Sequence, residues 1–326
     1  MPWPRFITSI SRESFLLIHD CPQDFVLTKW WDNPFVYAIW STFCSIYIMT
    51  VVIYSALESG YGFKILMWLT YWSLYNIELR FTFAAYNCWS YILHEKKRQQ
   101  AKPSFHLHVV DSSESIHKEQ IDDQADNVFT QTSDTGRKST DHCIVDNIVD
   151  KQSERSDAQL FSSKNDQRDP PQINLPVTMR CQWFFQNISN NISIMVTLLY
   201  WSLVYIGAPE DYGSINAHVT NSVIVIADIM ISRAPIRIEH FHITLTYLSI
   251  YIGFTVLYWA AGGTNHINKP YIYSILNYSS RPHVAALVIC LVALIGVILV
   301  QILTYYLYRL RNTLYSLRRR GVLFIR

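Results

Sequence analysis

The sequence has little charge and no recognisable cysteine motif. Only 16% of its 326 residues are Asp, Glu, Lys or Arg, against about 25% in an average soluble domain. Its six cysteines form no Cys-x-x-Cys pair, so their spacing gives no sign of a zinc site. No apolar stretch followed by a small-residue cleavage site opens the chain. We therefore expect the first apolar helix to direct the protein to a membrane.

Apolar sequence dominates instead, since half of the residues are hydrophobic and 14% are aromatic. A run of about 18 or more apolar residues can cross the roughly 30 Å hydrocarbon core of a bilayer as a helix. The sequence predicts an all-α fold, a six-helix transmembrane bundle embedded in membrane lipids. The six runs are at about residues 35–57, 63–93, 186–207, 215–232, 240–261 and 283–308.

Basic residues gather in alternate connections, whereas GAPEDYGSIN at 207–216 has two acids and no base. By the positive-inside rule this pattern places both termini in the cytosol. We expect an integral protein of the plasma membrane or endoplasmic reticulum, with no cofactor and no nucleic-acid partner. Its parts are a cytosolic N-terminal segment 1–34, helices 1 and 2 in 35–93, a cytosolic loop 94–180, helices 3 to 6 in 181–308 and a basic cytosolic tail 309–326.

The loop 94–180 differs in composition from the rest of the chain. It is rich in Ser, Asp, Gln and Thr and has few aromatic residues. Such a segment cannot bury enough apolar surface to offset the entropy of ordering it, so we predict that it is disordered.

Two of the predicted helices carry a polar stripe. At about 100° per residue, the polar residues of the second and fourth helices fall within about 120° and 80° of each other, respectively. An acid that faced lipid would cost several kcal/mol, so each stripe should face the bundle. The stripes are Thr70, Ser73, Asn76 and Arg80 in one helix, and His218, Asn221, Asp228 and Ser232 in the other.

Depth in the membrane predicts which of these residues meet. At about 1.5 Å per residue, Thr70 and His218 lie within about 10 Å of the outer side, whereas Arg80 and Asp228 lie roughly 20 to 25 Å in. A buried Arg80–Asp228 pair would offset the cost of both charges, and such a pair is more often structural than catalytic. A threonine in a membrane helix commonly bonds its own backbone, so Thr70 and His218 have a structural and a catalytic interpretation.

The ordered motifs of the chain resemble the rolling stone family of multi-pass membrane proteins. The resemblance implies a role in cell–cell fusion, as in myoblasts, or in muscle development. It is carried by ESFLLIHDCPQDFVLTKWW, WLTYW at 68–72, HVTNSVIVIADIMISRAPIRIEHFH, the glycine pair 262–263 and YIYSILNY.

More distantly, the chain is similar to the androgen-induced/FAR-17a family of six-span hydrolases of fatty-acid esters of hydroxy fatty acids. Leu69-Thr70-Tyr71 matches the family's threonine, and His218 precedes Asp228 by ten positions, as the family's histidine precedes its acid. The resemblance implies Thr70 as nucleophile and His218 as base, acting on a fatty-acid ester. An alternative alignment of Asn-Ser-Val at 221–223 would instead put Thr220 at the histidine position.

Three further patterns complete the expectations. His240 and His242 point about 200° apart on a regular helix, so we expect no metal site there. Asn277-Tyr-Ser is a glycosylation sequon in a predicted outer loop. Buried charges also suit a channel or transporter, but the sequence shows no internal repeat.

Overall fold

The computed structural model describes residues 15–60, 62–100, 175–205 and 215–321. The chain forms two compact units, residues 1–95 with 173–326 and residues 96–172, and the helical bundle described below belongs to the first. Its fold is all-α, as predicted. The predicted disordered loop 94–180 lies mostly outside the described residues, and its described ends are helical, since one helix continues to Gln100 and the next begins at Val177.

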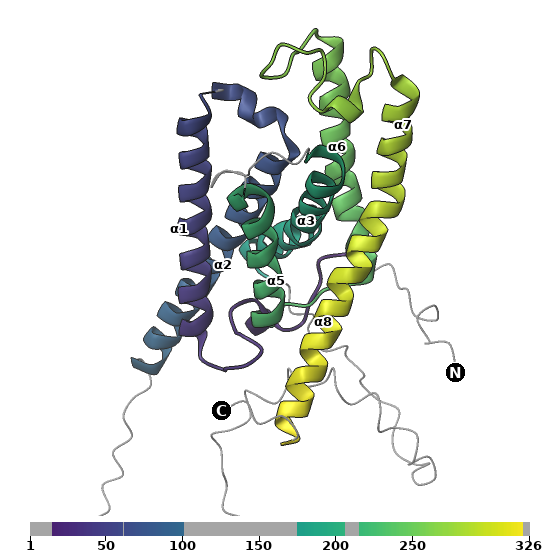
Figure 1. Ribbon diagram of the computed structural model, residues 1–326. Coiled ribbons are helices and arrows are strands. Elements are labelled where there is room, and N and C mark those ends of the chain that lie inside the picture. Colours follow the sequence, from purple (N-terminus) through teal and green to yellow (C-terminus); the bar gives the residue numbers. More distant parts are fainter. Residues whose placement is uncertain (1–14, 61, 101–174, 206–214, 322–326) are drawn as a thin grey trace, which may run out of the picture. The chain divides into compact units, whose positions relative to one another are not determined.

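The bundle has seven α-helices in its described part (Figure 1). Helices α1 and α2 lie on one side of α3 and α5, and α6 with α7 lies on the other. Three π-helical segments interrupt or extend them: η6 (Tyr200–Val204), η7 (Asn216–Thr220) and η10 (Leu291–Gly296). The α-helices are α1 (Pro34–Ser59), α2 (Leu69–Gln100), α3 (Val177–Leu199), α5 (Asn221–Ile231), α6 (Phe241–Ala260), α7 (Pro282–Cys290) and α8 (Val297–Arg319).

Within the described residues, three stretches are long and apolar enough to cross a membrane by length and composition: Pro34–Glu58, Ile238–Ala260 and Pro282–Arg319. The last is one continuous helix through α7, η10 and α8. The other predicted spans correspond to α2, α3 and α5, which carry most of the buried polar residues. Several boundaries differ from the prediction. Residues 62–67 form a short 3₁₀ helix before α2, and α3 begins at Val177 rather than at 186. Helix α2 continues to Gln100 rather than 93, and α8 continues to Arg319 rather than 308.

Helix α3 is the centre of the bundle and contacts α5, α6 and α8. Every residue from 186 to 196 is buried. Many of these are amides or hydroxyls, so the helix is polar on several sides. A helix of this kind is stable in a bilayer only when other helices surround it and satisfy its side chains.

The first described segment and the last helix meet at the same end of the bundle. The Lys29 ammonium lies 5.0 Å from the centre of the Tyr315 ring, and the Lys29 N–H donates to the Ile231 carbonyl at 2.8 Å. Nearby, Arg311 of α8 donates to the carbonyls of Ile229 and Ser232 at the end of α5. A cation at a helix C-terminus satisfies carbonyls that have no partner within the helix.

Candidate functional site

The deep half of the polar stripes forms a buried ion pair. Arg80 of α2 donates through Nη2 to Asp228 Oδ2 of α5, and the two side chains are 1% and 0% exposed. The other carboxylate oxygen accepts from Trp40 Nε1 at 2.9 Å. Arg80 Nη1 donates to Asn190 Oδ1 at 2.8 Å and to Ser189 Oγ at 3.3 Å. We call these five residues the ion-pair centre.

The geometry of this centre suits a structural role. A buried charge is tolerated when a partner and further hydrogen bonds replace its water. Both carboxylate oxygens of Asp228 are bonded, and Arg80 bonds three side chains. The depth argument paired Arg80 with Asp228, and the structure places them in contact. Glu78, on another side of α2, instead accepts from Ser45 at 2.8 Å and Thr82 at 2.7 Å.

A hydroxyl cluster continues the stripe from the ion-pair centre towards the start of α2. Ser73 Oγ lies 3.2 Å from Ser193 Oγ of α3, and Asn221 Nδ2 lies 3.4 Å from Ser73 Oγ. Asn76 takes a different path, because its Nδ2 donates to the Trp72 carbonyl at 2.7 Å and to the Tyr247 hydroxyl of α6. Ser73 and Asn221 therefore join α2, α3 and α5, whereas Asn76 joins α2 to α6.

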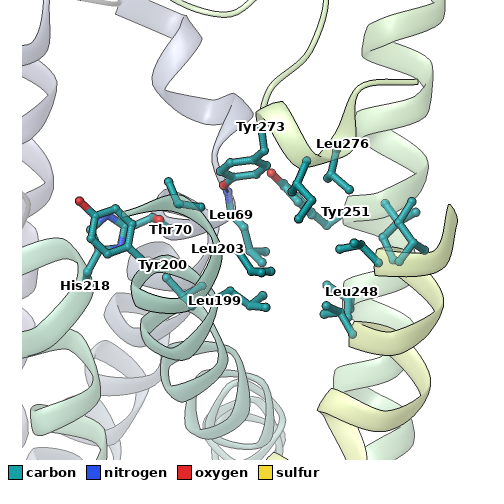
Figure 2. Close-up of a pocket in the computed structure, with 17 residues that line it drawn as sticks. Leu69, Thr70, Leu199, Tyr200, Leu203, His218, Leu248, Tyr251, Tyr273 and Leu276 are labelled. Atoms are coloured by element: carbon teal, nitrogen blue, oxygen red, sulfur yellow. Dashed lines mark hydrogen bonds between the residues drawn. The ribbon is translucent and has the colours of Figure 1, made fainter. Parts of the chain in front are cut away.

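Thr70 and His218 lie in the wall of one apolar cavity (Figure 2). The cavity has about 730 Å³ of empty space, including space open to its surroundings. Thr70, Tyr200 and His218 lie on one side of it, and Leu248, Tyr251 and Leu276 lie on the other. The remaining wall consists of Leu69, Val196, Leu199, Leu203, Val204, Ile252, Tyr273, Ile275, Val288, Ile289 and Val292.

The His218 ring is stacked face to face on the Tyr200 ring. Their centroids are 3.5 Å apart and the ring planes differ by 5°. Among the hydrogen bonds between described residues, none joins the Thr70 hydroxyl to this ring. The structure thus brings Thr70 and His218 to one cavity without the contact through which a base would activate the threonine.

Two tyrosines close the cavity against the start of α2. The Tyr251 hydroxyl donates to the Met67 carbonyl at 2.8 Å, and the Leu69 N–H donates to the Tyr273 hydroxyl at 3.0 Å. Tyr273 lies between α6 and α7, and its burial raises the pKa of its hydroxyl. Tyr273 therefore stays neutral at physiological pH and adds no charge to the wall.

All three π-helical segments contribute to this wall. Tyr200 comes from η6, His218 from η7 and Val292 from η10. π-helical turns are rare and occur frequently at functional sites. The three π-helical turns of the described chain thus all border this cavity.

The sequence arguments missed the contribution of α3 and the position of Tyr200. Ser189 and Asn190 bind Arg80, and Asn191 Nδ2 donates to Gln301 at 2.6 Å and Thr244 at 2.8 Å. The stretch QNISNNIS at 186–193 was the available signal, because its polar residues point in too many directions for a helix that faces lipid.

The remaining candidates lie away from the cavity. His240 packs on Trp183 with ring centroids 4.9 Å apart, and His242 Nδ1 lies 2.7 Å from the Glu239 carbonyl. The two histidine rings are tilted by 87°. Within the described residues, no three His, Cys, Asp or Glu side chains form a metal-binding group. Asn277 Oδ1 accepts from the Ser280 N–H at 3.0 Å.

Comparison with known proteins gives two findings. Residues 157–323 match the family described as "Protein rolling stone". A relative of that name from Drosophila melanogaster is 25% identical over 142 residues, which are 41% of this chain and 50% of the relative. The chain thus aligns with about half the length of that relative. No solved structure matches.

Proposed function

The chain belongs to the rolling stone family, and from this premise we propose that it is a multi-pass membrane protein that hydrolyses fatty-acid esters in its apolar cavity. One observation carries the proposal: Thr70 and His218 share the wall of that cavity. A hydroxyl and an imidazole beside an apolar pocket are the groups that acyl transfer requires.

The proposed chemistry proceeds in two steps. His218 accepts the Thr70 proton as Thr70 Oγ1 attacks the ester carbonyl carbon, and the carbon–oxygen ester bond breaks as the alcohol leaves with that proton. Water, deprotonated by His218, then attacks the acyl–threonine, and the fatty acid leaves as the proton returns to Thr70. Binding of the ester must first bring Thr70 and His218 within hydrogen-bond reach, as catalytic contacts often tighten only with substrate.

Orientation in the membrane is part of the proposal. The end of the bundle that holds Lys29, Arg233 and Arg311 faces the cytosol, in accord with the positive-inside rule. The cavity then lies towards the outer leaflet. A fatty-acid ester would reach it from the membrane rather than from water.

A fluorophosphonate reagent tests the hydrolase. Membranes with the wild-type chain should be labelled, because a threonine activated by a base attacks phosphorus as it attacks an ester. Thr70→Ala should remove the label and Thr70→Ser should keep it. The matched control is Thr246→Ala, which changes an exposed threonine of α6 and should leave labelling unchanged. Labelling that survives Thr70→Ala would refute Thr70 as the nucleophile.

A role in cell–cell fusion is the second candidate, and membership of the rolling stone family favours it. The test is to restore fusion in cells that lack the protein by expressing the wild type or Thr70→Ala. If both restore fusion, the protein acts without ester hydrolysis. If the wild type fails to restore fusion in cells whose fusion depends on a rolling stone family protein, the proposed role in fusion is refuted.

A further inference from the structure

The described wall of the apolar cavity has no carboxylate, ammonium or guanidinium group. None of its seventeen residues is Asp, Glu, Lys or Arg. The nearest charges along the polar stripe, those of Arg80 and Asp228, form an ion pair with each other. A phosphate or carboxylate that moved into the cavity would lose its water and gain no permanent counter-charge.

The polar groups of the wall are unevenly placed. The Tyr251 and Tyr273 hydroxyls are bonded to backbone at the start of α2. At the same helix start, the Thr70 hydroxyl takes part in no hydrogen bond with any described residue, although the residue is only 8% exposed. A ligand that places a carbonyl or hydroxyl group at Thr70 would give this group a partner, and buried polar groups gain stability from such a bond.

The dimensions of the cavity restrict the ligand further. Its empty space of about 730 Å³ includes space open to the surroundings, and its enclosed part is only about 100 Å³. The walls are therefore close together, so the space suits one hydrocarbon chain rather than two.

We infer that the cavity binds a single-chain, uncharged lipid, with its polar end at Thr70 and its hydrocarbon along Leu248 and Val292. This inference rests on the proposed function for the identity of the site and narrows its substrates to neutral, single-chain esters. Phospholipids and lysophospholipids should bind more weakly, because the described wall offers their phosphate no Arg or Lys side chain.

Photolabelling of the full chain in phosphatidylcholine nanodiscs tests the inference. The reagent is a 1-O-alkylglycerol with a diazirine in its chain, which is an uncharged ether that no esterase can cleave. Competitors of the same chain length are an alkylglycerol, a lysophosphatidylcholine and a fatty acid. The alkylglycerol should suppress labelling at a concentration about tenfold or more below those of the two charged lipids. Labelled peptides should map to residues of the cavity wall.

Two matched pairs of variants locate the site. Val292→Phe and Ile252→Phe fill the cavity from η10 and from α6, and each should abolish labelling. Their controls, Leu294→Phe and Ile250→Phe, change residues that are 60% and 58% exposed and should leave it unchanged. Gel filtration identifies any variant that fails to fold. If one cavity variant fails, the other cavity variant and its control test the position of the site.

The outcomes separate the inference from the hydrolase proposal. Equal competition by lysophosphatidylcholine or fatty acid would overturn the selection for uncharged lipid, and labelling outside the wall or unaffected by both cavity variants would overturn the site. The protein could show selective photolabelling of the wall and yet fail to react with the fluorophosphonate reagent. That result would support the lipid site and refute the hydrolase proposal.

Discussion

The ion-pair centre and the apolar cavity are two ends of one polar stripe, and they differ in how their polar groups are satisfied. Arg80 and Asp228 are fully buried and bonded on several sides. The Thr70 hydroxyl has no hydrogen bond to any described residue, and His218 has an aromatic ring against its face. A network in which every polar group is hydrogen-bonded holds helices together. A hydroxyl without a hydrogen-bond partner, beside open space, can instead bind a ligand.

The backbone shows the same difference. Arg80 lies within regular α-helix and Asp228 in the last turn of α5, whereas the cavity is surrounded by η6, η7 and η10. π-helical turns lose some regular hydrogen bonding and persist when tertiary contacts compensate. In this protein the regular helices around the ion-pair centre pack together and set the positions of their neighbours. The π-helical turns border the apolar cavity that remains between the helices.

The largest expected effect comes from breaking the ion pair. Asp228→Ala leaves the Arg80 charge buried without its partner, so we expect it to lower the free energy of unfolding by about 3–5 kcal/mol. Unfolding by sodium dodecyl sulfate in mixed micelles measures this change. The matched control is Asp32→Ala, since Asp32 pairs with Arg233 but is 83% exposed, and it should cost less than about 1 kcal/mol.

A double variant sharpens the result. Arg80→Met with Asp228→Leu removes both charges, so it should recover a large part of the stability that Asp228→Ala loses. Equal losses from Asp228→Ala and Asp32→Ala would contradict the structural role of the ion-pair centre.

An intermediate effect is expected at the stacked pair. Tyr200→Leu removes the aromatic face that would attract the imidazolium formed when His218 accepts a proton. We expect ester hydrolysis to slow by about tenfold with little change in KM. Tyr200→Phe keeps the face and should keep the rate. If Tyr200→Phe slowed hydrolysis as much as Tyr200→Leu, the rate would depend on the Tyr200 hydroxyl and not on the stacking of the two rings.

The smallest effect on stability is expected at Asn277. Asn277→Gln removes the sequon and one exposed hydrogen bond to Ser280, so it should change stability by less than about 1 kcal/mol. In cells it should remove a glycan, measured as faster gel migration of the variant and no further shift with endoglycosidase. Identical migration of wild type and variant would contradict a glycosylated outer loop.

Periodicity and depth were enough to pair Arg80 with Asp228, because the two charges lie at similar depths on the polar stripes of their helices. They also brought Thr70 and His218 to one cavity. They could not place Tyr200, because the rotation of its ring towards His218 depends on π-helical turns that arise from tertiary packing. The early start of α3 was missed because MRCQWFFQN is too polar for a span that faces lipid.

The polar surface of α3 has a consequence for biosynthesis. On insertion scales, a helix with this many amides is a poor substrate for the translocon when it emerges alone. Asn191 is bound by Gln301 and Thr304, which belong to α8 and are synthesised well after α3. We therefore expect stable integration of α3 to wait for α8, so truncations before α8 should be recognised by membrane quality control.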